Sequence, residues 1–325
     1  MDIYFREAYG KLNEYIENGT CETFVYQSNL GQVRHMFIKR QLPFSVDGEQ
    51  WYDLITPYGY GGPQVVRAQE GAKEALCEAF GKAFSEYCRD NRIVSEFIRF
   101  HPLEGNAADF QALYHPIYMR KTLGTDLESY ADPVQSEFSR GCRKSIRQAL
   151  RKGVEVHVTE RPDDLSTFCR IYHDTMRRDH ASSFYYFDRS YFDAMLRLIP
   201  ENLLYIEARY EGTAIAAGLC LLSDRTMHVH LSGTLEDYLH LSPAYVLRYA
   251  AVVWGKEHGY RVLHHGGGTS NAEDNPLYLF KRQFARNTDF DFYIGKKIWN
   301  QRIYDAAVQQ SGLEPGGYFP QYRLP

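Results

Sequence analysis

HVHLSGTLEDYLHLSPAYVLRYAAVVWGKEHGYRVLHHGGGTSNAEDNPLYLFKRQF (residues 228–284) is the stretch that decides how the second half of this chain folds. Its pattern predicts a strand, a helix over residues 243–258, a strand over residues 261–265, a Gly-Gly-Gly turn and a short helix over residues 275–285. A strand that leads to a helix N-terminus is a common place to bind phosphate or to stabilise a developing negative charge. The stretch therefore predicts a site for group transfer on a phosphate-bearing substrate.

Two features of this stretch predict where a donor or cofactor would bind. Ser242 and Pro243 suit the N-cap and first position of the helix, with the hydroxyl accepting a backbone N–H and the other amides favouring an anion such as pyrophosphate. An ordinary capped helix is the alternative interpretation. Gly266 and Gly267 in the turn permit close backbone approach to a ligand. No GxxxxGK[ST] motif or dinucleotide fingerprint is present, which excludes NAD and P-loop sites.

Lys281 is the predicted catalytic cation. It stands on the last helix of the stretch among Leu277, Phe280 and Phe284. A lysine in such company either extends its ammonium to water or is partly buried for a reason. If buried, the ammonium can stabilise an oxyanion during acyl transfer.

Four histidines in the stretch raise the question of a metal. His228 and His230 are expected to share one strand face, whereas alternation sends His264 and His265 to opposite faces. At most three imidazoles would then converge, and a zinc site usually adds a carboxylate or thiolate. We therefore predict no metal site, and a role for one histidine as general base or hydrogen-bond partner of an amine.

The whole chain has the composition of a globular protein of about two domains. It has 325 residues and a net charge of −4, which argues against a general nucleic-acid coat or a polybasic membrane binder. The six cysteines are scattered without a CxxC pair, and no signal peptide or membrane-spanning run is evident. These features predict a cytoplasmic protein with reduced thiols and no integral membrane segment.

A local cluster of cations contrasts with this acidic balance. Residues 139–153, SRGCRKSIRQALRKG, contain six cations and no acid, and helical spacing places most of them on one side. One interpretation is a solvated face of an interdomain helix. The other is an electrostatic contact for phosphates or RNA, with tRNA as a candidate partner.

A second candidate binding group lies between two predicted helices. Arg178 ends the helix expected over residues 163–178, and the segment that follows contains Tyr185 and Tyr186. An arginine with nearby tyrosine hydroxyls is suited to a substrate phosphate. Arginines are also common at helix C-termini because the dipole favours them.

The order of predicted elements repeats along the chain. Helix 4–18, a hairpin turning at residues 29–31, a strand at 51–56, helix 69–91 and a strand at 94–100 give the order α-β-β-β-α-β. The second half opens with a strand at 154–158 and then follows the same order. This predicts two tandem α/β (α+β) units.

Six segments carry a resemblance to a known family, and their order covers nearly the whole chain. They are YDLITPYGYGGP (52–63), RKSIRQALRKGVEV (143–156), YHDTMRRDHA (172–181), LSGTLEDYLHLSPAYVL (231–247), LYLFKRQF (277–284) and FYIGKKIWN (292–300). Together with the glycine turn, they make the chain resemble the FemABX aminoacyltransferases and the related BioF/CelD-like acetyltransferases of the GNAT superfamily.

The resemblance implies a fold and a reaction. It implies two tandem GNAT-like domains, each a mixed, mostly antiparallel sheet flanked by helices. The domains would span residues 1–135 and 154–325, joined by a basic linker helix at 136–153, with the C-terminal tail packing on the first domain. It also implies acyl transfer from aminoacyl-tRNA or acyl-CoA to an amine, with no permanently bound cofactor.

The resemblance also assigns residues by position. Phe280 and Lys281 match the family's Phe-Lys pair, whose lysine stabilises the transition state. Arg178, a tyrosine of the pair at 185–186, and Lys11 match phosphate contacts to a nucleotide-linked peptidoglycan precursor.

Three departures from the family pattern leave the acceptor and donor open. His230 stands where the peptidoglycan enzymes tend to have an aromatic residue, and His264-His265 replace an acidic one. The acyl-CoA pyrophosphate pattern is absent, and LSPAYVL occupies its place. A non-catalytic ligand-binding or RNA-binding protein with the same fold is the alternative.

Overall fold

The computed structural model describes residues 1–272, 274–314 and 316–324. The chain folds into two compact units. The 121–290 unit consists of residues 1–3 and 121–290, and the 4–120 unit consists of residues 4–120 and 291–325. The C-terminal segment thus belongs to the same unit as most of the first half. The domain boundaries expected at residues 136 and 154 stay a prediction.

The 4–120 unit is built on a mixed sheet of six strands among the described residues. β1, β2 and β3 form an antiparallel meander, β4 also pairs with β2, β5 is parallel to β3, and β12 is antiparallel to β5. The strands are β1 (Thr20–Ser28), β2 (Gly31–Gln41), β3 (Tyr52–Ile55), β4 (Gln64–Ala68), β5 (Ile93–Arg99) and β12 (Asp289–Ile298), the last entering this unit at residue 291.

Helices flank this sheet and fill its core with aromatic side chains. Phe80 and Phe84 of α3 are fully buried and stack with ring centroids 5.4 Å apart. The helical elements are η1 (Ile3–Phe5), α1 (Glu7–Leu12), α2 (Glu14–Glu17), α3 (Lys73–Asp90), α4 (Asn106–Asp109), α5 (Gln111–Tyr114) and α12 (Gln301–Ser311). The single helix expected over residues 4–18 is wrong, because the chain turns at Asn13 between α1 and α2.

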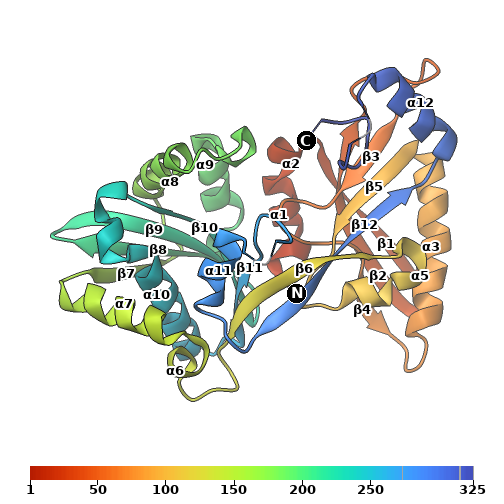
Figure 1. The fold of residues 1–325 in the computed structure, drawn as a ribbon. Coiled ribbons are helices and arrows are strands. Elements are labelled where there is room, and N and C mark those ends of the chain that lie inside the picture. The colour runs from red at the N-terminus through yellow and green to blue at the C-terminus, as the bar shows by residue number, and fades with distance from the viewer. Residues whose placement is uncertain (273, 315, 325) are drawn as a thin grey trace. The chain divides into compact units, whose positions relative to one another are not determined.

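The 121–290 unit contains a second mixed sheet. Its strand order is β6-β11-β10-β9-β8-β7, in which only β10 and β11 run parallel. The strands are β6 (Ile117–Asp126, entering this unit at residue 121), β7 (Glu155–Glu160), β8 (Leu203–Tyr210), β9 (Thr213–Leu222), β10 (Thr226–Thr234) and β11 (Val262–Gly266). Figure 1 shows α8 and α9 on one side of β8–β10, and α7 and α10 on the other.

The helical elements of this unit mostly lie where the sequence predicts them. They are α6 (Pro133–Glu137), α7 (Arg140–Arg151), α8 (Ser166–Arg178), η2 (Ser183–Tyr185), α9 (Arg189–Leu198), η3 (Pro200–Asn202), η4 (Glu236–Leu241), α10 (Pro243–Glu257) and α11 (Pro276–Arg282). The start expected for α8 at residue 163 is wrong, because the helix begins at Ser166. Asp164 lies before the helix, where its carboxylate accepts a hydrogen bond from the Ser166 amide.

The two units share one plan. In each, a three-stranded meander is followed by a long helix, α3 or α10, and then by a strand that pairs in parallel with the third meander strand. The predicted fold class, mixed and mostly antiparallel sheets flanked by helices, is confirmed. Within the described ranges, no helix combines the length and the apolar character that crossing a bilayer requires.

The contact between α8 and β10 gives a test of this packing. A Cβ added to Gly233 of β10 would lie 2.8 Å from both the Ile171 carbonyl oxygen and Thr175 Oγ1. Because one of these neighbours is backbone, we expect Gly233→Ala to lower the free energy of unfolding by about 1–3 kcal/mol.

Gly141→Ala is the control for this substitution. Gly141 lies on α7, where the nearest atom to an added Cβ would be 3.9 Å away. Alanine there should raise the free energy of unfolding by up to about 1 kcal/mol. Urea denaturation followed by circular dichroism measures both variants, and equal stabilities would contradict the close packing of α8 on β10.

Candidate functional site

The candidate site lies where β10 and β11 stop pairing. Their parallel register runs from Thr226 opposite Val262 to His228 opposite His264. Just beyond, β10 shifts register against β9 at residue 230, and β11 shifts against β6 at residue 265. Such irregularities re-aim side chains and are frequent near active sites. All four histidines of this region therefore lie at or beside the end of the parallel pairing.

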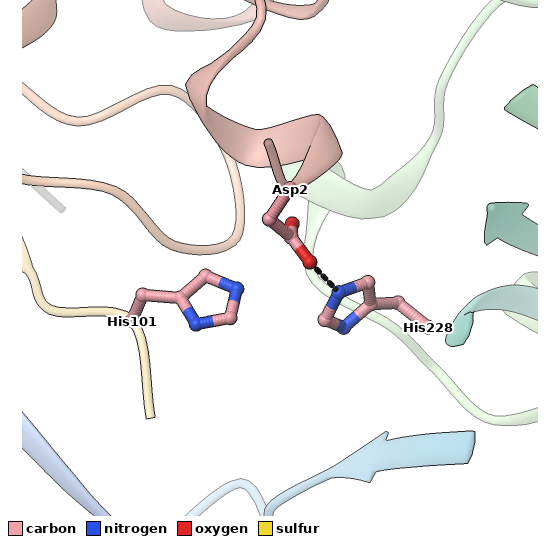
Figure 2. Close-up of side chains that lie close together, drawn as sticks. All are labelled: Asp2, His101 and His228. Carbon is pink, nitrogen blue, oxygen red and sulfur yellow. Dashed lines mark hydrogen bonds and ion pairs between the residues drawn. The ribbon is translucent and has the colours of Figure 1, made fainter. Parts of the chain in front are cut away.

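A buried hydrogen-bonded chain links the ends of the two paired strands. His228 Nε2 lies 2.8 Å from the Asp2 carboxylate, and its Nδ1 lies 3.4 Å from His264 Nδ1. Figure 2 shows the Asp2 side chain directed at the His228 ring. Asp2, His228 and His264 are each at most 6% exposed. Sequence reasoning missed Asp2, because no local pattern connects residues so far apart along the chain.

His230 is a neutral imidazole beside a tyrosine hydroxyl. Its Nε2 lies 3.1 Å from the Tyr191 hydroxyl, and the Tyr191 ring packs on Phe187 with centroids 4.7 Å apart. Burial, with a smaller contribution from His228, lowers the pKa of His230 to about 3. At neutral pH the ring therefore serves as a hydrogen-bonding group without charge. The register shift at this residue interrupts the strict alternation that sequence reasoning assumed.

His265 is also neutral, and its tautomer follows from its partner. Its Nε2 lies 2.9 Å from Thr125 Oγ1, and the Thr125 hydroxyl donates to the Phe284 carbonyl at 2.8 Å. Because that hydroxyl proton is already used, Nε2 of His265 donates, and Nδ1 carries the lone pair. Burial, then the charges of Arg248 and Lys281, hold the pKa of His265 well below its usual value.

Lys281 stands on α11, and its ammonium is bound by the turn that follows β11. Its ammonium donates to the Gly267 carbonyl oxygen at 2.7 Å. The neighbouring Phe280 ring meets the Tyr245 and Phe284 rings edge-on, at 5.4 and 5.1 Å. The predicted Phe280-Lys281 pair thus lies beside Gly267, which was predicted independently of it.

The glycine turn after β11 and the start of α11 are each fixed by a different local feature. Gly266 has φ +74°, in the left-handed region that glycine adopts without strain. α11 begins at Pro276, where the Asn275 side chain accepts the amide of Tyr278 at 3.0 Å. This cap sets the direction in which α11 presents Lys281.

The predicted cap at Ser242 is wrong in its chemistry, although the helix begins where expected. Ser242 has φ 53° and ψ 44°, and its side chain caps no helix amide. A side-chain N-cap needs an extended backbone at that position, which the left-handed conformation of Ser242 does not provide. The Ser242 carbonyl instead accepts the Tyr245 amide at 3.1 Å.

Arg178 lies at the far end of β10. Its Nη1 donates to the Thr234 carbonyl oxygen at 2.7 Å, and its Nε pairs with the Asp179 carboxylate at 2.8 Å. The side chain is 22% exposed, so part of the guanidinium faces solvent. Arg178 and His230 therefore flank the second half of the same strand.

The two predicted tyrosines follow α8 and lie on the surface. Tyr185 and Tyr186 are 39% and 40% exposed. The Tyr172 hydroxyl donates to the Tyr185 carbonyl oxygen at 2.7 Å and anchors the segment. Lys11, in contrast, belongs to the 4–120 unit, where it is exposed on α1 and pairs with Glu7 at 2.8 Å.

α7 presents a face of cations. Ser139 caps the helix by accepting the Cys142 amide at 3.0 Å, while Cys142, Ile146 and Ala149 point into the core. The cations that lie exposed are Arg140, Lys144, Arg147, Arg151 and Lys152. None of them forms an ion pair with any residue that the structure describes. Arg143 donates to the carbonyl oxygens of Gln135 and Phe138.

The low pKa of His265 predicts acid sensitivity of the fold. The unfolded chain protonates this histidine below about pH 6.5, whereas the folded chain does not. The free energy of unfolding should therefore fall by up to about 1.4 kcal/mol per pH unit as the pH drops below 6.5. His265→Gln should reduce this slope, and His157→Gln, at a half-exposed position, should leave it unchanged. Urea denaturation between pH 7 and pH 5 measures the slopes, and equal values for His265→Gln and the unaltered chain would contradict the assignment.

Comparisons with known proteins agree with this architecture. Residues 136–282 match the family described as an acetyltransferase (GNAT) domain. A UDP-N-acetylmuramoylpentapeptide-lysine N(6)-alanyltransferase from Weissella viridescens is 24% identical over 209 residues. That match covers 63% of this chain and 60% of the relative, so it spans less than two thirds of the relative's length.

Solved structures share the fold across nearly the whole chain. A crystal structure of FemX superposes with a TM-score of 0.70 and 14% identity, covering 94% of each chain. The C-terminal domain of a putative lysylphosphatidylglycerol synthetase from Agrobacterium fabrum gives 0.59 and 15%, covering 95% of this chain and 92% of that one. The resemblance predicted from the sequence is confirmed: residues 136–282 match the acetyltransferase (GNAT) domain family, and nearly the whole chain is similar in fold to FemX.

Proposed function

We propose that this protein transfers an aminoacyl group from aminoacyl-tRNA to an amine of a nucleotide-linked peptidoglycan precursor. The observation that carries the proposal is the Lys281 ammonium, fixed on the Gly267 carbonyl at the end of the GNAT-type domain. A cation held in place by backbone can stabilise a charge that develops during acyl transfer without reorganising. The alanyltransferase from Weissella viridescens, to which the chain is similar, supports the same reaction class.

The proposed reaction requires no covalent enzyme intermediate. The acceptor nitrogen attacks the ester carbonyl carbon, the new C–N bond forms, and the C–O bond to the tRNA ribose breaks. The amine loses one proton and the departing ribose oxygen gains one. Lys281 would stabilise the oxyanion of the tetrahedral intermediate, and Phe280 would hold its helix against the aromatic core.

The acceptor would lie along β10. His230, neutral at physiological pH, can accept a hydrogen bond from the attacking amine and orient it, but with its low pKa it is a poor proton acceptor. Arg178, with Tyr185 or Tyr186, would hold the acceptor's phosphates through its solvent-facing guanidinium edge. Lys11 stays a predicted phosphate contact that rests on the resemblance.

The cations of α7 support tRNA as the donor. Five exposed cations, none of which pairs with an acid among the described residues, form a surface that a nucleic-acid backbone would neutralise. Gly266 and Gly267, with the helix start at Ser242, would accommodate the reactive end of the donor. Aminoacyl-tRNA is made in the cytoplasm, and the reaction would take place there, without a permanently bound cofactor.

Acyl-CoA is the second candidate donor. The description of the matching family as an acetyltransferase favours it. The two donors differ in what they need from α7, because a CoA molecule carries far fewer phosphates than a tRNA acceptor stem.

Lys281→Ala tests the proposed catalytic role. Loss of one oxyanion-stabilising donor should lower kcat about 100- to 1000-fold while donor binding is retained. The assay is transfer from alanyl-tRNA to UDP-linked muramoyl pentapeptide, under single-turnover conditions. Arg282→Ala is the matched control, because Arg282 is the next residue of α11 and its side chain is 39% exposed. Unchanged turnover in Lys281→Ala would remove Lys281 from the mechanism, and no turnover in the unaltered chain with either donor would favour a ligand-binding protein.

Neutralising α7 tests the donor. Replacing Arg140, Lys144, Arg147 and Arg151 by Gln should weaken tRNA binding and lower the slope of log K against log salt by roughly 3. A control variant removes four exposed, acid-paired arginines from the same unit: Arg161, Arg189, Arg225 and Arg261. Filter binding of tRNA distinguishes the two variants. The measurement runs from roughly 50 to 200 mM salt, the range over which phosphate contacts weaken. Equal losses in both variants would show that net charge alone, and not α7, attracts the tRNA.

A further inference from the structure

Arg248 is a buried cation without a partner among the described residues. It lies on α10 and is 7% exposed. Its Nε is buried and has no hydrogen-bond partner, and its guanidinium forms no ion pair with any residue that the structure describes. A guanidinium carries five N–H donors. Within the described ranges, no residue accepts a hydrogen bond from this guanidinium, and its Nε is shielded from solvent.

Burial of this kind is costly without a compensating anion. Removing a charged group from water costs several kcal/mol unless it is paired and hydrogen-bonded. Burial lowers the pKa of Arg248 to about 10, which still leaves it charged at neutral pH. Cys220 provides no counter-charge, because burial raises the pKa of its thiol to about 11.

Another buried arginine in the same protein illustrates the usual solution. Arg40, 6% exposed, donates through Nε to the Asp53 carboxylate at 2.7 Å. Arg248 is buried to the same extent, and among the described residues it has no such acid. The contrast leaves room for an acceptor supplied by a ligand.

Arg248 lies beside the candidate site. It is one helical turn from Tyr245, whose ring contacts Phe280 and Phe284 at 5.4 Å each. His265 contacts Phe284 from β11, with ring centroids 5.9 Å apart. Nδ1 of His265 is buried and has no hydrogen-bond partner in the described part of the chain, so an unsatisfied acceptor accompanies the unsatisfied Arg248 Nε.

We propose that Arg248 binds an oxyanion, either a carboxylate or a phosphate, of a ligand that enters the 121–290 unit beside Lys281. The planar guanidinium suits both oxyanions, because each offers two oxygens to its fork of N–H donors. His265 stays uncharged and can accept a hydrogen bond from an N–H group of the same ligand. This binding needs no turnover, so it does not depend on the transfer reaction proposed above.

Thermal unfolding with simple anions tests the site. The probes are inorganic pyrophosphate and succinate, which separate phosphate from carboxylate recognition. One or both should raise the melting temperature of the unaltered protein in a saturable manner. Arg248→Met should weaken that binding by about 10- to 100-fold, the loss expected for charge-assisted hydrogen bonds. Arg282→Met, at a nearby exposed position, should leave it unchanged.

The ligand-free variant gives an independent readout. Because methionine replaces an uncompensated buried charge with an apolar chain, Arg248→Met should melt at or above the temperature of the unaltered protein. A merely structural arginine would give the opposite result. A lower melting temperature in Arg248→Met with undiminished anion binding would overturn the proposal.

A measurement on the unaltered protein covers the case in which the variant fails to fold. In protein labelled with ¹⁵N-arginine, the Nε–H resonance of Arg248 should shift on titration with whichever probe stabilises the protein. Arg248→Lys identifies the resonance by its disappearance. A resonance that stays unmoved at saturating pyrophosphate and succinate would also overturn the proposal.

Discussion

The 121–290 unit depends on a parallel pairing that lasts for only three residue pairs. β10 and β11 are joined from Thr226 and Val262 to His228 and His264, and both strands become irregular just beyond. Where the pairing ends, the two strands present imidazoles, and the turn after β11 binds the Lys281 ammonium through the Gly267 carbonyl oxygen.

Local patterns were sufficient to predict the elements that frame this region. The order strand–helix–strand around α10 and the basic helix α7 follow from periodicity in the sequence. Lys281 could be selected because a lysine among aromatic residues on a short helix is unusual. These features depend on neighbours within a few residues, which a sequence displays directly.

Other features depend on distant partners and could not be predicted. Asp2 reaches His228 across more than two hundred residues, and β4, β6 and β12 pair with strands far away in the sequence. The left-handed backbone of Ser242 departs from its apparent capping pattern. Arg248 stands among apolar residues of α10, where a cation resembles a surface residue until its burial is known. Tertiary packing decides each of these cases.

The composition of the units also has a consequence for synthesis of the protein. The 121–290 unit includes residues 1–3, and the 4–120 unit includes residues 291–325 with most of β12. During translation, Asp2 leaves the ribosome more than two hundred residues before His228, and β5 waits almost as long for its antiparallel neighbour. At roughly 5–20 residues per second, the early segments remain incomplete for about ten seconds or more. Each unit can therefore complete its fold only after its last segment has been synthesised, and the native contacts of both are completed late in translation or after release.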